Sequence, residues 1–128
     1  MRLFISATLI LAALVHLLPL AGVLGSAQLN TLYGIPIAEP NLELLMRHRA
    51  VLFGLLGGLL LLAAFRPTLQ PAAFIAGLVS VGSFLLLALL VGEINPLLRR
   101  VVIVDAVALV LLLAGAAARW QVNAQLAK

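Results

Sequence analysis

Cysteine is absent from the 128-residue sequence, and charged residues make up only 9% of it. Without cysteine the chain can form neither disulfides nor thiolate metal sites. A soluble domain normally carries about 25% charged residues. A soluble surface with so little charge would expose large apolar patches and aggregate. The scarcity of charge therefore excludes an ordinary soluble domain.

Motifs of soluble enzymes and of nucleic-acid-binding proteins are also missing. The sequence has no P-loop, no dinucleotide fingerprint and no GxSxG elbow. The two histidines, His16 and His48, lie in different hydrophobic blocks and give no ligand set for a metal, diiron or haem centre. The eight Lys and Arg residues are dispersed and form no basic run. We therefore expect no metal, no cofactor and no nucleic-acid partner.

Hydrophobic residues, in contrast, make up 65% of the chain and come in long blocks. Blocks of about 20 apolar residues match the hydrocarbon thickness of a bilayer. The first block is longer than the apolar stretch of a signal peptide, so we expect it to stay as a helix. The sequence predicts an all-α, integral membrane four-helix bundle, a single transmembrane domain over residues 1–128. Its helices are predicted at approximately 3–24, 41–65, 71–91 and 96–120.

The connector between the first two predicted helices carries a further helix signal. Ser26 can cap a short helix over residues 27–33, and Gly34 can end it. We expect this helix to lie in the membrane interface with Tyr33 at headgroup depth. Asn41 is the expected cap of the second long helix.

The charges predict an orientation. With four spans, the end that holds both termini carries Arg2, Arg66, Arg119 and Lys128 and no acid. The opposite end holds all four acidic residues, Glu39, Glu43, Glu93 and Asp105. By the positive-inside rule both termini are cytoplasmic, in a multi-pass protein of the inner membrane. Arg47, Arg49, Arg99 and Arg100, near the other end, are counted here as lying within helix ends.

Polar residues within the predicted spans fall at one depth. His16, Arg47, Arg49, Ser83 and Asp105 all lie roughly 8 to 15 Å below the helix ends opposite the termini, at about 1.5 Å per residue. Ionisable groups in spans are expensive and usually face the bundle interior or a water-filled cavity. The candidate ligand-binding or buried polar cluster comprises His16, Tyr33, Glu43, Arg47, Arg49, Ser83 and Asp105.

Helical spacing ranks the two arginines as partners for Asp105. Arg47 shares a stripe with Glu43 and with small residues, Ala50, Gly54 and Gly57, that let another helix approach closely. Arg49 shares its stripe with larger side chains. Arg47 is therefore the first choice as partner of Asp105, and Arg49 the second.

Simpler roles stay open for the same residues. Asp105 with an arginine can be a structural pair that holds helices in register. His16 can bond a backbone carbonyl or a hydroxyl. Arg47 and Arg49 can snorkel to lipid phosphates.

Several short motifs give a family resemblance. The segment Leu32-Tyr33-Gly34-Ile35, an acidic-proline connector, and Arg47-His48-Arg49-Ala50 before a glycine-rich helix resemble small bacterial four-helix proteins of the DoxX-like kind. Arg99-Arg100-Val101-Val102 with Asp105 extends the likeness to a subgroup often labelled phosphopantetheine adenylyltransferase. This chain has no room for that soluble enzyme's fold or nucleotide site. Some DoxX-like relatives are implicated in quinone-linked or sulfur redox chemistry.

Three functions are compatible with these patterns. The first is binding of a lipid, quinone or other amphipathic molecule in a cavity of the outer leaflet, where Arg47 or Arg49 meets an anionic or carbonyl group. The second is a structural protein whose buried charges only fix helix packing. The third is an isomerase-like membrane enzyme that uses His16 and Asp105. The sequence favours binding over an enzyme, with membrane lipids and a second copy of the chain as expected partners.

Overall fold

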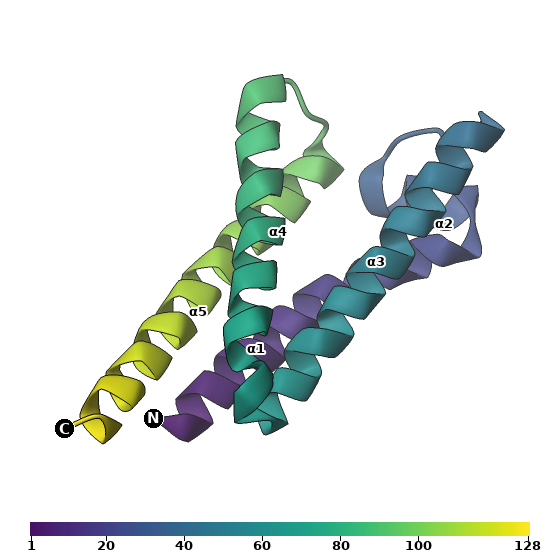
Figure 1. Ribbon diagram of the computed structural model, residues 1–128. Coiled ribbons are helices and arrows are strands. Elements are labelled where there is room, and N and C mark those ends of the chain that lie inside the picture. Colours follow the sequence, from purple (N-terminus) through teal and green to yellow (C-terminus); the bar gives the residue numbers. More distant parts are fainter.

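The computed structural model describes residues 1–128 and contains helices but no strand (Figure 1). Three of its elements are short, and four α-helices are long. In chain order the elements are α1 (Arg2–Leu17), the 3-10 helix η1 (Leu18–Leu24), α2 (Ser26–Tyr33), α3 (Pro40–Phe65), the 3-10 helix η2 (Pro67–Leu69), α4 (Gln70–Val91) and α5 (Pro96–Leu126).

Four helical segments are long and apolar enough to cross a membrane, which confirms the predicted all-α class with four long apolar helices. These candidate spans are Arg2–Leu24, Pro40–Phe65, Pro67–Val91 and Pro96–Leu126. The last helix continues beyond its predicted end at residue 120. Residues 121–126 include Gln, Ala and Leu and no Gly or Pro, so nothing in them stops the helix.

The first span changes from α-helix to 3-10 helix at Leu18. Pro19 explains the change, because proline has no N–H to donate and its ring clashes with the carbonyl four residues earlier. The span then ends at Gly25, whose φ of 139° only glycine adopts readily. The helical segment runs over Arg2–Leu24, against the predicted 3–24, and its last part is not α-helical.

Two predicted helix caps are wrong. Glu39, not Asn41, caps α3: its carboxylate accepts the backbone N–H groups of Asn41 at 3.0 Å and of Leu42 at 2.8 Å. Pro40 fits the first helical turn, so the helix begins one residue before Asn41. Ser26 makes no capping hydrogen bond, because Gly25 occupies that position. Gly34 does end α2, in the left-handed conformation with a φ of 66°.

The first span is the central element of the packing. It contacts α3 on one side and α5 on the other, and α4 contacts α5 and α3. The main core is built largely from small residues, and its fully buried leucines are Leu9, Leu60 and Leu112. Figure 1 shows both chain termini at one end of the molecule, which we call the terminal end, and α3 and α4 diverging toward the opposite end.

Small residues on α3 let the first span approach closely. Gly54 faces the Leu20 side chain, and Gly57 faces Leu17 and the Ala13 carbonyl oxygen. This is the contact predicted from the small-residue stripe.

A second, smaller core holds α2 against the rest of the molecule. Leu29, Tyr33 and Ile37 are buried there, against partly buried residues that include Met46 of α3 and Leu98 of α5. The Tyr33 side chain is only 4% exposed. The Tyr33 side chain therefore packs inside the protein, between α2, α3 and α5.

Candidate functional site

Arg49 is the centre of the polar group between α2 and α3. Its Nη1 donates a hydrogen bond to the Tyr33 hydroxyl at 3.0 Å. The guanidinium carbon lies 4.6 Å from the centre of the Phe53 ring and 5.4 Å from that of Tyr33. At these distances both rings make cation–π contacts with the Arg49 guanidinium. The guanidinium has no carboxylate within ion-pair distance.

Phe53 was not among the predicted site residues. The sequence does indicate that Phe53 lies beside Arg49, because residues four apart in a helix are neighbours on the helix surface. The Phe53 ring also lies 5.9 Å from the His16 ring, so it joins the first span to the Arg49 group.

His16 is buried, and its Nδ1 lies 2.8 Å from the Ala12 carbonyl oxygen. A carbonyl only accepts hydrogen bonds, so Nδ1 is the donor and carries a proton. His16 thus has the backbone partner that the simpler interpretation expected. It makes no hydrogen bond to Asp105.

Asp105 lies half-buried on α5 without a hydrogen-bond or ion-pair partner in the protein. The predicted pair between Asp105 and Arg47 does not form. Arg49, the second choice, does not pair with Asp105 either and is bonded to Tyr33.

Arg47 points instead toward η1. Its Nε donates to the Val23 carbonyl oxygen at 2.8 Å, and its Nη1 lies 3.5 Å from a Glu43 carboxylate oxygen. Val23 is near the end of a helical segment, where carbonyl groups lack a partner within the helix. Arg47 supplies that partner, and it is therefore not available to Asp105.

The predicted serine lies apart from this group. Ser83 is exposed on α4, and its hydroxyl donates to the Ser80 carbonyl oxygen at 3.0 Å. Ser80 is nearer to Arg49: both line a pocket of about 190 Å³ between α3 and α4, together with Leu52, Phe53 and Leu56.

Asn95, which the sequence analysis did not single out, has a structural role. Its Oδ1 accepts the Leu98 N–H at 2.8 Å and so caps α5. Its Nδ2 donates to the Tyr33 carbonyl oxygen at 2.7 Å. The side chain thus fixes the end of α2 on the start of α5, beside the Asp105 region.

Asp105 lines a pocket of about 180 Å³ between α2, α5 and the first span. Its polar lining groups are Tyr33, Arg100 and Asp105, and the other lining side chains, which include Val15 and Leu18, are apolar. Arg100 was not among the predicted site residues, because its place at the helix end suggested only an anchoring role.

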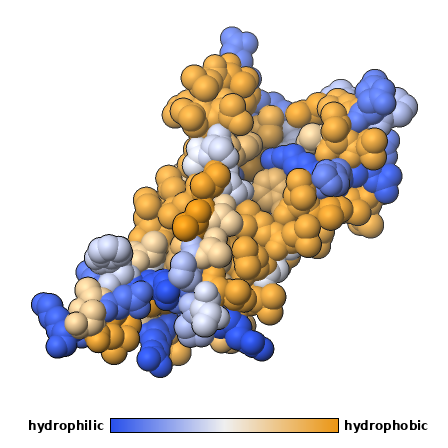
Figure 2. All heavy atoms as spheres, viewed as in Figure 1, coloured by the Kyte–Doolittle hydropathy of each residue, from blue (hydrophilic) through white to orange (hydrophobic).

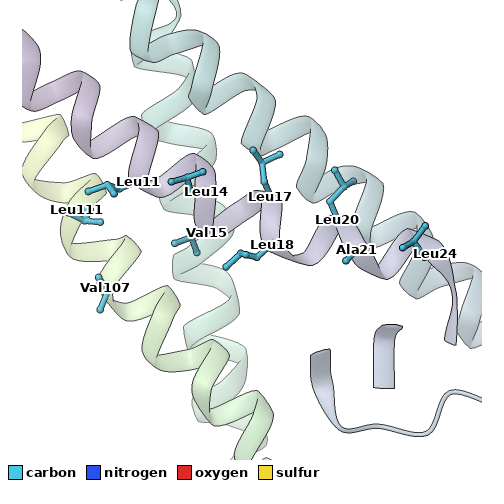
Figure 3. A pocket seen from close by; sticks show the side chains of 10 residues that line it. All are labelled: Leu11, Leu14, Val15, Leu17, Leu18, Leu20, Ala21, Leu24, Val107 and Leu111. Atoms are coloured by element: carbon cyan, nitrogen blue, oxygen red, sulfur yellow. The ribbon is translucent and has the colours of Figure 1, made fainter. Parts of the chain in front are cut away.

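A larger apolar groove adjoins this pocket. It has a volume of about 1060 Å³, and Val15 and Leu18 belong to both. Figure 3 shows its walls: the leucine-rich face of α1 and η1 on one side, and Val107 and Leu111 of α5 on the other. All ten lining residues are hydrophobic. The two spaces together offer a long apolar surface with a carboxyl group at one end.

Comparisons with protein-family models, with curated proteins and with solved structures gave no match. Fold and composition thus define the class as an all-α protein with four helices capable of spanning a membrane.

Proposed function

We propose that this chain is a multi-pass membrane protein that binds an amphipathic molecule, with its polar head beside Asp105 and its apolar chain in the groove of Figure 3. The observation that carries the proposal is the unpartnered carboxyl of Asp105 on a candidate span. An ionisable residue at such a depth is expensive, and it marks a ligand or ion site by default.

The composition supports insertion in a bacterial inner membrane. The long helices expose many leucines and valines, including Leu86, Leu89 and Val110. Lipid chains are a suitable environment for these side chains, whereas water is not. The arginines near the terminal end favour a cytoplasmic location for both termini. The DoxX-like motifs agree with a bacterial source.

The chemistry of the pocket describes the head of the ligand. A carboxyl group accepts hydrogen bonds when ionised, and it also donates one when protonated. Tyr33 and Arg100 line the same pocket. A head with hydroxyl or carbonyl groups fits these partners, as in a lipid or a quinone. The lining of the groove, free of polar side chains, suits a hydrocarbon or isoprenoid chain.

The arrangement favours binding over the two alternatives. A purely structural role for Asp105 requires a partner that satisfies it, and the carboxyl has none. Proton transfer between His16 and Asp105 requires hydrogen-bond reach. His16 is instead bonded to its own helix. Of the redox chemistries that the DoxX-like resemblance implies, any that uses a protein thiol is excluded, because the chain has no cysteine.

Mass spectrometry of molecules that copurify with the protein tests the proposal. Wild-type protein should retain an amphipathic species after detergent extraction, and Asp105→Asn should retain about tenfold less of that species, because hydrogen bonds to charged groups contribute roughly 1.5–3 kcal/mol. Leu111→Trp, within the groove, should also displace it. Leu113→Trp is the matched control, because Leu113 is exposed and lies outside the groove. Equal retention by all four proteins, or no retained species in the wild type, would refute the proposal.

A further inference from the structure

A second polar pocket lies at the terminal end, away from Asp105. It has a volume of about 320 Å³ and is formed by the ends of α1, α3 and α5 and the start of α4. Five of its 11 lining residues are polar, whereas the groove of Figure 3 is lined by hydrophobic residues alone. The polar lining residues are Arg2, Ser6, Gln70, Arg119 and Asn123.

Hydrogen bonds hold this pocket in shape. Arg119 Nη1 donates to Gln70 Oε1 at 3.1 Å, and the Gln70 side chain is buried. The Ser6 hydroxyl donates to the Ala64 carbonyl oxygen at 2.7 Å, which fixes α1 against α3 beside it. A guanidinium has five N–H donors, and this contact uses one of them. Arg119 is therefore positioned on the protein while most of its donors remain available.

The charge at this end has one sign. Arg2 and Arg119 line the pocket, and neither has a carboxylate within ion-pair distance. The acidic side chains lie toward the opposite end; on α5, Asp105 is about 21 Å from Arg119 at about 1.5 Å per residue. Figure 2 shows hydrophilic atoms gathered at the end where Figure 1 places the termini. Two arginines without acidic partners favour the binding of an anion in this pocket.

We propose that this pocket binds the phosphate group of an anionic phospholipid from the leaflet at the terminal end. Arginine recognises phosphate through paired hydrogen bonds, and basic pockets between membrane helices take anionic headgroups. The apolar side chains of Ile5, Phe65 and Leu126 also line the pocket. They suit the glycerol and first acyl carbons of a lipid, and they give a free phosphate nothing to contact. The site is separate from the Asp105 pocket and does not depend on it.

Native mass spectrometry of the purified protein with added lipids tests this assignment. With phosphatidylglycerol and phosphatidylcholine in equal amounts, wild-type protein should bind the anionic lipid about tenfold better. Arg2→Gln and Arg119→Gln should each weaken phosphatidylglycerol binding about fivefold, the effect of about 1 kcal/mol per arginine near a membrane surface. The Arg2 side chain makes no hydrogen bond within the protein, so Arg2→Gln removes a charge without breaking a side-chain contact of this kind.

Arg66→Gln is the matched control. Arg66 is exposed at the same end but does not line the pocket, so its loss should change binding less than twofold. An equal loss in the Arg66 and Arg2 variants would show general surface attraction and overturn the site. A second arm adds sn-glycerol 3-phosphate, which should not displace the lipid at millimolar concentration. Saturation by this soluble phosphate with no gain for the lipid would overturn the assignment to a phospholipid.

Discussion

Gly57 and Gly58 are neighbours on α3 with opposite surroundings. A Cβ added at Gly57 would lie 2.7 and 2.8 Å from Leu17 Cγ and Cδ2, and 3.3 Å from the Ala13 carbonyl oxygen. A Cβ added at Gly58 would meet nothing within 4 Å. Substituting alanine at each position therefore compares the same chemical change in a tight contact and in open space.

The pair isolates the effect of packing. Alanine is favoured over glycine within a helix by about 1 kcal/mol, and this gain is common to both variants. Only Gly57→Ala forces the first span away from α3, and overpacking of this kind costs about 1–3 kcal/mol. We expect Gly57→Ala to be less stable than Gly58→Ala by about 1–3 kcal/mol, because the propensity term cancels between them.

Unfolding of purified protein in detergent micelles by added SDS measures this difference. Helical circular dichroism reports on the fold, and linear extrapolation gives the free energy of unfolding for each variant. Adding Leu17→Ala should reduce the difference in unfolding free energy between the two alanine variants, because it removes the clashing atoms of Leu17. This comparison is a double-mutant cycle across the contact. Equal stability of Gly57→Ala and Gly58→Ala would refute the close approach of the first span to α3.

Three further predictions concern the end opposite the termini. Tyr33→Phe keeps the ring but loses the hydrogen bond from Arg49, which should lower the unfolding free energy by about 1.5 kcal/mol in the same assay. Asn95→Ala removes the cap of α5 and the bond to α2, and it should lower stability by about 1–2 kcal/mol and speed amide exchange at the start of α5. The backbone N–H groups of Asn41 and Leu42 lower the pKa of Glu39 below its ordinary value of 4.5. The contribution of Glu39 to stability is therefore complete above pH 4.5 and is lost as pH falls through the lower pKa of the folded state. Hydrogen exchange of the Leu42 amide should become faster over that pH range. Glu39→Gln should remove this pH dependence of the exchange rate.

The long helices could be predicted because their signal is summed over many residues. Each span contains about 20 apolar side chains, so no single substitution would change the prediction of a membrane-spanning helix. The ends of the helices depend on one or two residues. Asn41 is the better cap by residue type, but Glu39 takes the position because Pro40 after it fits the first helical turn.

The absence of an ion-pair partner for Asp105 could not be predicted, since helical spacing gives the direction of a side chain but not its partner. The Arg47 stripe does allow another helix to approach closely, as predicted, but that helix is the first span and not α5. The 3-10 segment after Pro19 then presents the Val23 carbonyl oxygen to Arg47. Arg49 lies on the adjacent face, where the docking of α2 brings Tyr33 to it. That docking depends on contacts with α5, far away in the sequence.

The two proposed sites should bind their ligands independently, because their key residues lie far apart along α5. Asp105 and Arg119 are about 21 Å apart along this helix and share no partner. Effects at sites more than about 10 Å apart usually add. Asp105→Asn should therefore leave phosphatidylglycerol binding unchanged, and Arg119→Gln should leave the copurifying species unchanged. Loss of both ligands in either variant, with helical circular dichroism intact, would indicate one continuous site and contradict two separate ones.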